Sequence, residues 1–292
     1  MKLFELIGNT PLVELQHIPT NPNVKIYCKL EGQNPGGSVK DRAAYSMIRN
    51  ALERGDIKKG DKLVEATSGN TGIALAMIAK VLGVEMTLIM PDNSTRERVV
   101  SMEAYGAKVI LTPAAKTIEY SRTLAEEMAE KEGYYILNQF ANPDNYRAHY
   151  EGTGPEIFKD TNGEITHFVS AMGTTGTIMG VSRYLKEQNA AIQIVGTQPT
   201  DGSSIPGIRR WSPEFLPKIY ESSRVDQIID VSQSDATEMT RRMAREEGVL
   251  AGMSSGGALH AAIKLSETLD SGVIVCITCD RGDRYLSSDL FG

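Results

Sequence analysis

The stretch "THFVSAMGTTGTIMGVSRYL", residues 166–185, contains the pattern that decides the fold. Residues 166–172 predict a short strand, the small residues 173–177 predict a loop, and the apolar spacing after them predicts a helix over 177–188. Backbone N–H groups at a helix start and threonine hydroxyls together suit an anion such as phosphate. The loop contains no acidic side chain that would compete with such an anion. The loop is neither a Walker loop nor G-x-G-x-x-G, so an ordinary tight turn is the other interpretation.

Strand and helix patterns alternate along the rest of the chain. Further strands are predicted at 62–66, 85–91, 107–112, 192–199 and 272–279, and further helices at 73–83, 94–106, 116–132 and 256–269. This alternation predicts an α/β protein whose parallel sheets carry helices on both faces. Binding sites in such sheets gather where strands lead into helices. Small-residue loops at 67–72 and 252–256 are predicted to occupy the same kind of position.

A lysine stands at another predicted helix start, in "EGQNPGGSVKDRAA" (31–44). Ser38 is the predicted N-cap, which makes Lys40 the second helical residue. The helix macrodipole disfavours a cation there, lowers the lysine's pKa and favours a neutral amine that can act as nucleophile and base. Gly36 and Gly37 are expected to leave room for a planar ligand. A solvated lysine on an ordinary loop is the alternative.

The two other small-residue loops allow different chemistry. "TSGNTG" (67–72) offers hydroxyl and amide groups to a second anion such as a substrate carboxylate, and Asn70 can reach a ring oxygen. "GMSSG" (252–256) matches the G-x-S-x-G nucleophile elbow of hydrolases. That function requires an acid and then a histidine downstream, whereas His260 follows with no carboxylate between. A hydrolase is therefore disfavoured, and the serines are left for structure or for a ligand.

The composition excludes several classes of protein. The 292 residues are 41% hydrophobic and carry a net charge of −6, without the basic patch of a nucleic-acid-binding protein. No apolar run reaches the roughly 18 residues of a membrane span, and the N-terminus lacks a signal-peptide pattern. We therefore expect a cytoplasmic protein. Three cysteines do not make a disulfide framework.

The remaining candidates are weaker. Cys276 and Cys279 form C-x-x-C on a predicted strand without a second pair, so no metal site is predicted; Cys276 is expected in the core and Cys279 at the strand end. The four histidines are scattered and receive no role. "GIRRW" (207–211) is either an anion-binding lid or a solvated basic loop.

Together the motifs resemble one family. "NPGGSVKDRAA", "EATSGNTGIALA", "AMGTTGTIMGVSRYL" and "AGMSSGGA" occur in the order found in fold-type II pyridoxal-phosphate enzymes. The chain is similar to the cysteine synthase (O-acetylserine sulfhydrylase) branch, and "IGNTPLVEL", "GSSIPGIRRW" and "ITCDRGDRYLS" resemble its B isozyme. The resemblance covers nearly the whole chain. Thr175 replaces a glycine of the usual phosphate loop, as in the B isozyme.

The resemblance implies a role for each matching residue. Lys40 would carry pyridoxal 5'-phosphate as a Schiff base, Asn70 would bind the ring hydroxyl oxygen, and Ser254 would face the pyridine nitrogen. The cofactor phosphate would be held by Gly173, Thr174, Thr175, Gly176 and Thr177. The substrate carboxylate would be bound by Thr67, Ser68, Thr71 and Gln139. A polar pocket for the sulfur donor would be lined by Arg209, Arg210, Cys279 and Asp280.

The implied reaction replaces the acetate of O-acetyl-L-serine with sulfide, giving cysteine, or with thiosulfate, giving S-sulfocysteine, through an α-aminoacrylate. Lys40 would remove the α-proton. Cystathionine β-synthase and serine/threonine dehydratase use the same loops and stay open, as does a non-catalytic binding protein of this fold. The small-molecule substrates are the expected partners, with no nucleic acid and no membrane.

The implied architecture has two α/β domains, each with a mostly parallel twisted sheet and helices on both faces. We predict a smaller, mobile domain at 35–145 and a larger one made of 1–34 and 146–292, with the cofactor in the cleft between them. A homodimer is expected from the same resemblance.

Overall fold

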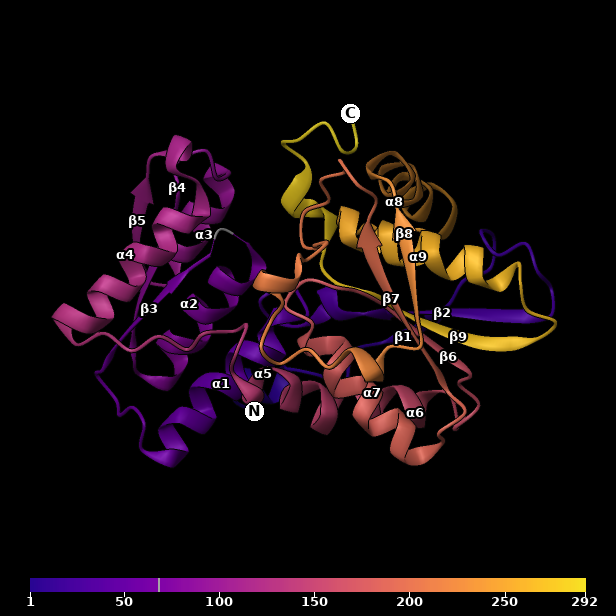
Figure 1. Ribbon diagram of the computed structural model, residues 1–292, viewed down its shortest axis with the longest axis horizontal. Helices are drawn as coiled ribbons and strands as arrows, with labels where there is room; N and C mark the ends of the chain where they lie inside the picture. The colour runs from indigo at the N-terminus through magenta and orange to yellow at the C-terminus, as the bar shows by residue number, and fades with distance from the viewer. Residues whose placement is uncertain (68) are drawn as a thin grey trace. The chain divides into compact units, whose positions relative to one another are not determined.

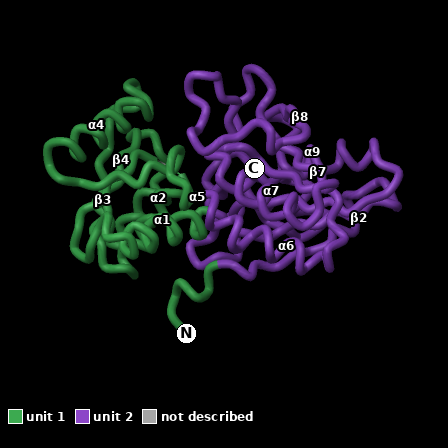
Figure 2. Tube along the Cα trace, turned by 60° about the horizontal axis from the view of Figure 1, so that its bottom comes forward, with its two compact units in different colours: residues 1–7, 40–145 green, residues 8–39, 146–292 purple. Residues whose placement is uncertain are grey.

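The computed structural model describes residues 1–67 and 69–292, which form two compact units (Figures 1 and 2). Unit 1 contains residues 1–7 and 40–145, and unit 2 contains residues 8–39 and 146–292. The predicted boundaries placed residues 35–39 in the smaller domain, whereas they lie in unit 2, and residues 1–7 in the larger one. Residues 1–7 belong to unit 1, where the Phe4 ring stacks on Tyr45 with centroids 5.3 Å apart.

Unit 1 is built on a three-stranded parallel sheet in the order β3-β4-β5. The strands are β3 (Lys62–Ala66), β4 (Glu85–Pro91) and β5 (Lys108–Thr112). The helices are α1 (Lys40–Arg54), α2 (Asn70–Leu82), α3 (Arg96–Ala104) and α4 (Thr117–Glu132). The short helix α5 (Pro143–Ala148) follows and contains the boundary with unit 2.

Alternate residues of the unit 1 strands enter two separate cores. Leu63 and Leu88 pack with apolar residues of α1 and α2, whereas Val64 and Ile89 pack with Ala125 and Met128 of α4. Because successive strand residues point to opposite faces, this division means that helices cover both faces of the sheet.

Unit 2 is built on a six-stranded sheet in the order β1-β2-β9-β6-β7-β8, in which only the β1–β2 pair is antiparallel. The strands are β1 (Leu12–Glu14), β2 (Val24–Leu30), β6 (His167–Ala171), β7 (Gln193–Pro199), β8 (Gln227–Val231) and β9 (Gly272–Thr278). The longer helices are α6 (Gly154–Asp160), α7 (Gly176–Gln188), α8 (Gln233–Glu247) and α9 (Met253–Ser266).

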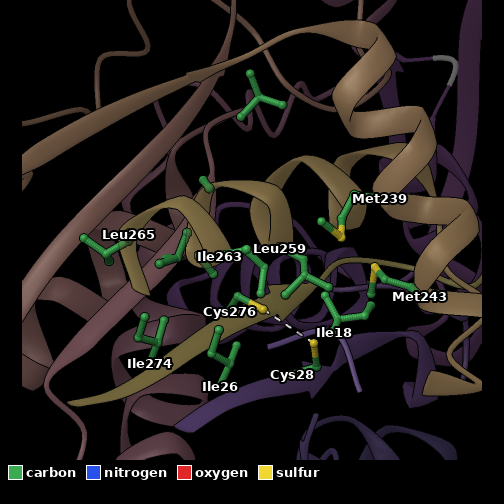
Figure 3. Close-up of a cluster of buried hydrophobic side chains, with 14 of the residues drawn as sticks. Ile18, Ile26, Cys28, Met239, Met243, Leu259, Ile263, Leu265, Ile274 and Cys276 are labelled. Atoms are coloured by element: carbon green, nitrogen blue, oxygen red, sulfur yellow. Dashed lines mark hydrogen bonds between the residues drawn. The ribbon is translucent and has the colours of Figure 1, made fainter. Parts of the chain in front are cut away.

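The unit 2 sheet is also covered on both faces. One core joins β2, β6, β7 and β9 to α8 and α9, and the other joins the same sheet to α6 and α7. Cys28 and Cys276 face each other in the first core with their Sγ atoms 3.5 Å apart, among isoleucines, leucines and methionines (Figure 3). The neighbouring Cys28 thiol and burial raise the pKa of Cys276, so core packing is the role that the structure gives it.

The predicted α/β class is confirmed, and the predicted strands agree closely with β3 to β7 and β9. The sequence patterns did not predict β1, β2, β8, α5, α6 or α8. Among the described helices, none combines the length and the apolar character that crossing a membrane requires.

Candidate functional site in two parts

The lysine of segment 31–44 lies at the start of a helix, as expected, one position nearer the helix start than predicted. Lys40 is the first residue of α1. Ser38 is fully buried and forms an isolated antiparallel bridge with Asp280, and the Val39 N–H donates to the Cys279 carbonyl at 2.8 Å. Strand-like pairing of residues 38–39 therefore leads directly into the helix, and the Ser38 cap stays a prediction.

The second of the two glycines before that lysine faces an arginine rather than open space. Gly37 has φ +80°, and a Cβ there would lie 2.6 Å from an Arg284 guanidinium nitrogen. The same guanidinium donates to the Gly36 carbonyl. The prediction that both glycines admit a planar ligand is therefore wrong for Gly37, which is needed for a left-handed turn beneath an arginine.

In unit 1, the loop between β3 and α2 brings two predicted carboxylate ligands together. The Thr71 hydroxyl donates to Gln139 Oε1 at 2.9 Å, and both side chains are buried. This contact occupies the amide oxygen of Gln139, so its NH₂ group is the part suited to an anionic oxygen. Thr67 is also buried and accepts from the Gly69 N–H at 3.5 Å. Asn70 is the first residue of α2, and Ser68 lies outside the described residues.

In unit 2, the loop between β6 and α7 forms a cradle of hydroxyls. Thr174, Thr175 and Thr177 are at least nine-tenths buried. Thr175 is the N-cap of α7 with φ +69°, the left-handed conformation for which glycine is favoured. Its Oγ1 is buried and has no hydrogen-bond partner among the described residues. Such an orphaned hydroxyl at a helix N-terminus calls for an external acceptor.

Segment 207–211 packs against the loop 173–177 and hydrogen-bonds to its start. The Trp211 indole N–H donates to the Gly173 carbonyl at 2.8 Å, and the Arg209 N–H donates to the Met172 carbonyl at 2.9 Å. A Cβ on Gly173 would lie 2.5 Å from the Gly207 carbonyl oxygen. The "GIRRW" segment is therefore packed against the loop rather than being a separate basic loop.

His149, to which the sequence analysis gave no role, lies beside the same loop. Its Nε2 is 3.4 Å from Thr177 Oγ1, and its Nδ1 is 2.9 Å from Thr153 Oγ1. It is buried in a π-helical turn, His149–Thr153. Such turns occur often at functional sites. A lone histidine carries no spacing signal, so sequence reasoning had no means of finding it.

The start of α9 presents Ser254, which is buried. The prediction that "GMSSG" follows a strand is wrong, because only an isolated bridge between Ala251 and Arg281 precedes it. Gly252 and Gly256 are explained by packing: a Cβ on Gly252 would overlap Asp280, and one on Gly256 would overlap Thr240 of α8. The hydrolase motif therefore arises from close contacts.

Asp280 and Cys279 take part in holding this region together. The buried Asp280 carboxylate accepts from the Gly252 N–H at 3.2 Å and from the Tyr285 hydroxyl at 2.6 Å. The Cys279 N–H donates to Ser255 Oγ at 2.9 Å, and its side chain is partly exposed. These contacts of Asp280 support the start of α9, which adds a structural role to its predicted place in a pocket.

The two neighbouring arginines of "GIRRW" differ in their surroundings. Arg209 is exposed and lines a cavity of about 160 Å³ with Thr175, Gln198 and Trp211. Arg210 forms ion pairs with Asp230 and Asp201 and donates to the Pro199 carbonyl. Arg209 therefore lies at a cavity, while Arg210 braces β7 and β8.

Comparison with known proteins agrees with these motifs. The family model described as "Pyridoxal-phosphate dependent enzyme" matches residues 3–280. "Cysteine synthase B" of Pseudomonas aeruginosa is 59% identical over 287 residues, which cover 98% of this chain and 96% of that protein. "Cysteine synthase B" of Escherichia coli is 55% identical over 290 residues, which cover 99% of this chain and 96% of that protein.

A solved structure shows the same fold. O-acetyl serine sulfhydrylase isoform 3 from Entamoeba histolytica superposes with a TM-score of 0.93 at 38% identity, over 99% of this chain and 91% of that one. The buried threonine cradle at α7 and the lysine at the start of α1 are features that such a cofactor requires. This chain belongs to the family of pyridoxal-phosphate-dependent enzymes, with the fold-type II architecture.

Proposed function

We propose that this protein is a cysteine synthase of the B type, which replaces the acetate of O-acetyl-L-serine with a sulfur nucleophile. The observation that carries the proposal is the 59% identity to a cysteine synthase B along 98% of the chain. The thiosulfate reaction, which gives S-sulfocysteine, is part of the proposal. The other β-replacement and dehydratase activities of this fold are the outcomes that the experiment must separate.

The residues present fit pyridoxal phosphate. The buried hydroxyls of Thr174, Thr175 and Thr177, the α7 N-terminus and the orphaned Thr175 Oγ1 form a donor set for its phosphate. Lys40 would hold the cofactor covalently through Nζ, and Asn70 and Ser254 would bind its ring atoms. Gly173 and Gly176 would supply backbone N–H groups. When bound, the cofactor withdraws electrons from the substrate α-carbon.

The chain's own groups would then act as follows. Lys40 Nζ takes the α-proton of O-acetyl-L-serine and later returns a proton. The NH₂ group of Gln139 and the hydroxyls of Thr67 and Ser68 hold the substrate carboxylate and so orient its Cα–H bond toward Lys40 Nζ. Thr71 contributes by donating to Gln139 Oε1, which holds that amide in place. A neutral Ser254 opposite the ring nitrogen moderates the electron withdrawal, which favours elimination of acetate over transamination.

The same proposal extends to the sulfur donor, the assembly and the compartment. Arg209 at its cavity is proposed to balance the charge of thiosulfate, with Arg210, Cys279 and Asp280 as further parts of the donor pocket. A homodimer in the cytoplasm is proposed from the resemblance to the B isozyme. Size-exclusion chromatography with light scattering tests the dimer, and a monomeric mass would contradict it.

The first experiment records the visible absorption of the purified holoprotein and then adds O-acetyl-L-serine. We expect the band to shift with O-acetyl-L-serine and to return on addition of sulfide or thiosulfate. A band that ignores O-acetyl-L-serine but responds to serine plus homocysteine would replace the proposal with cystathionine β-synthase activity. Serine-dependent release of an oxoacid would indicate a dehydratase.

Lysine substitution provides the second test. Lys40→Ala should reduce steady-state turnover by at least about a thousandfold, because the base and the attachment point are both lost. Lys58→Ala, which changes an exposed lysine of the same unit, is the control and should leave turnover unchanged. Turnover of Lys40→Ala within tenfold of wild type would disprove the assigned role.

A further inference from the structure

A buried carboxyl group lies in the strand that leads to the proposed substrate loop. Glu65 is the fourth residue of β3, is only 5% exposed, and stands two residues before Thr67. Beside this strand runs the segment 134–140, which forms an isolated parallel bridge between Leu63 and Tyr135. Continuing that pairing by two residues brings Glu65 level with Leu137. The side chain therefore lies where strand pairing ends and the turn containing Gln139 begins.

Beyond the paired part of the strand, the Glu65 carboxyl group accepts hydrogen bonds from the backbone of the turn, as the backbone of a neighbouring strand would. Its Oε2 accepts from the Asn138 N–H at 3.2 Å, and the N–H groups of Leu137 and Gln139 also interact with it. Asn138 has φ +55°, so the backbone changes direction at this point. A left-handed turn that aims consecutive N–H groups at one acceptor forms a small anion-binding nest. Here the anion is a side chain of the protein itself.

The far side of the same turn carries the proposed carboxylate ligand. The Gln139 carbonyl accepts from Asn145 Nδ2 at 2.8 Å, and its side-chain oxygen accepts from Thr71 at 2.9 Å. Arg122 of α4 lies over the Phe140 ring, 4.8 Å from its centroid, and its charge also acts on Glu65. Contacts from β3, α2, α4 and α5 thus converge on residues 137–140.

Holding a charge in this place is unfavourable for the fold. Burial raises the pKa of Glu65 to about 7, although the three backbone N–H groups and Arg122 act to lower it. Opposite Glu65, β4 presents Leu88, and the segment 134–140 contributes phenols but no acidic or basic side chain. Arg122 is the charged group on the packed elements that acts on it. A buried acid with a raised pKa weakens a fold at neutral pH, which indicates that function retains it.

We propose that Glu65 is a positioning residue for substrate binding: its ionised carboxylate fixes the 137–139 backbone so that Gln139 can hold the substrate carboxylate. The proposal rests on the proposed function, because it assumes that Gln139 binds the substrate. Protonation of Glu65 replaces charge-assisted hydrogen bonds with weaker neutral ones and loosens the turn. Substrate affinity should therefore rise as the pH rises through neutrality.

The test compares wild type with Glu65→Gln between pH 6 and pH 8. We expect the wild-type KM for O-acetyl-L-serine to fall about tenfold over this range, the size expected when a charged hydrogen bond replaces a neutral one, with kcat nearly constant. Glu65→Gln should lack this component and match wild type near pH 6. Titration of the substrate ammonium affects both proteins equally and cancels. Parallel KM profiles would overturn the proposal.

Glu31→Gln is the matched control. Glu31 is also fully buried, but it accepts from Thr10 Oγ1 and Asn34 Nδ2 in unit 2. A general effect of neutralising a buried glutamate would appear in both variants, whereas the proposed effect should appear only in Glu65→Gln. A loss of the pH component in both variants would also overturn the proposal.

A second readout does not require turnover. Amide hydrogen exchange of the holoprotein at pH 8 should be faster in Glu65→Gln for residues 137–139 and unchanged for 173–177. If Glu65→Gln does not fold, Arg122→Gln serves instead, and it should move the KM midpoint to higher pH. Unchanged exchange at 137–139, or an unmoved midpoint, would contradict the positioning role. If the wild-type protein does not react with O-acetyl-L-serine, only the proposed function is contradicted, because the hydrogen-exchange measurement does not require the substrate.

Discussion

The helix starts of α2 and α7 follow parallel strands and carry threonines, yet their polar groups are committed differently. At α2, the hydroxyl of Thr71 is paired with Gln139, and the N-cap Gly69 has an extended conformation. At α7, the Thr175 hydroxyl has no partner among the described residues, and the N-cap is left-handed. One helix start is completed by a side chain from elsewhere in its unit, whereas the other keeps a donor for a ligand.

This difference indicates how each helix start would bind an anion. A cofactor phosphate that stays bound can serve as the permanent partner of the α7 hydroxyls. A substrate carboxylate that comes and goes needs donors that keep their geometry without it, and at α2 the contacts among Thr71, Gln139 and Glu65 provide that. Anion binding at the α7 loop should therefore depend on the space around its backbone. Anion binding at the α2 loop should depend on the buried charge of Glu65.

The largest effect should come from adding a methyl group to each helix start. Gly173→Ala places Cβ 2.5 Å from the Gly207 carbonyl, so the backbone must move. A strain of about 3 kcal/mol would weaken pyridoxal phosphate binding by roughly a hundredfold. Gly69→Ala meets nothing within 4 Å and should change the melting temperature by only a degree or two. Absorbance titration of the apoproteins measures the pyridoxal phosphate affinity of both variants, and thermal unfolding measures the melting temperature of Gly69→Ala. Similar cofactor affinities in the two variants would contradict the expected difference.

The next largest effect concerns the free energy of unfolding and tests the charge of Glu65, which lies next to the α2 loop. The folded pKa of Glu65, about 7, exceeds the ordinary glutamate value of 4.5. Wild type therefore loses stability as the pH rises from about 4.5 through 7, and Glu65→Gln does not. The difference in unfolding free energy should move in favour of the variant by about 3 kcal/mol across this window. Urea unfolding at pH 4.5 and pH 8 measures it, and an unchanged difference would show that Glu65 stays ionised at little cost.

These two loops also show what a sequence can and cannot predict. The strand-loop-helix pattern around 166–185 was readable because strand and helix periodicities are local, and the resemblance supplied roles for Lys40 and Gln139. Glu65 left one trace, an acid inside the apolar run "KLVEA", but its partner at Asn138 lies 73 residues away. The pairing of Ser38 with Asp280 is just as distant along the chain, so local periodicity could not predict it either.

A smaller effect should separate the two arginines packed near α7. Arg209 lines the cavity beside Thr175, whereas Arg210 is paired with Asp230. Arg209→Ala should raise the KM for thiosulfate about fivefold and leave the KM for sulfide within twofold, because only the larger dianion needs the charge. Arg210→Ala should change the KM values for thiosulfate and sulfide by the same factor, because it acts through the packing of the 207–211 segment. Equal thiosulfate KM values in wild type and Arg209→Ala would exclude a role for that side chain.

The smallest effect tests whether the α7 hydroxyl serves the phosphate. A threonine at φ +69° costs about 1 kcal/mol relative to glycine, although glycine also gives the unfolded chain more freedom. Thr175→Gly should therefore leave apoprotein stability within about 0.5 kcal/mol of wild type. It should weaken pyridoxal phosphate binding about fivefold, because a neutral hydrogen bond of roughly 1 kcal/mol is lost. Thr175→Asn tolerates the left-handed backbone, keeps a donor and should retain most of the affinity. If Thr175→Gly binds the cofactor as tightly as wild type, the hydroxyl faces the Arg209 cavity instead, and the two helix starts differ less than their hydrogen bonds suggest.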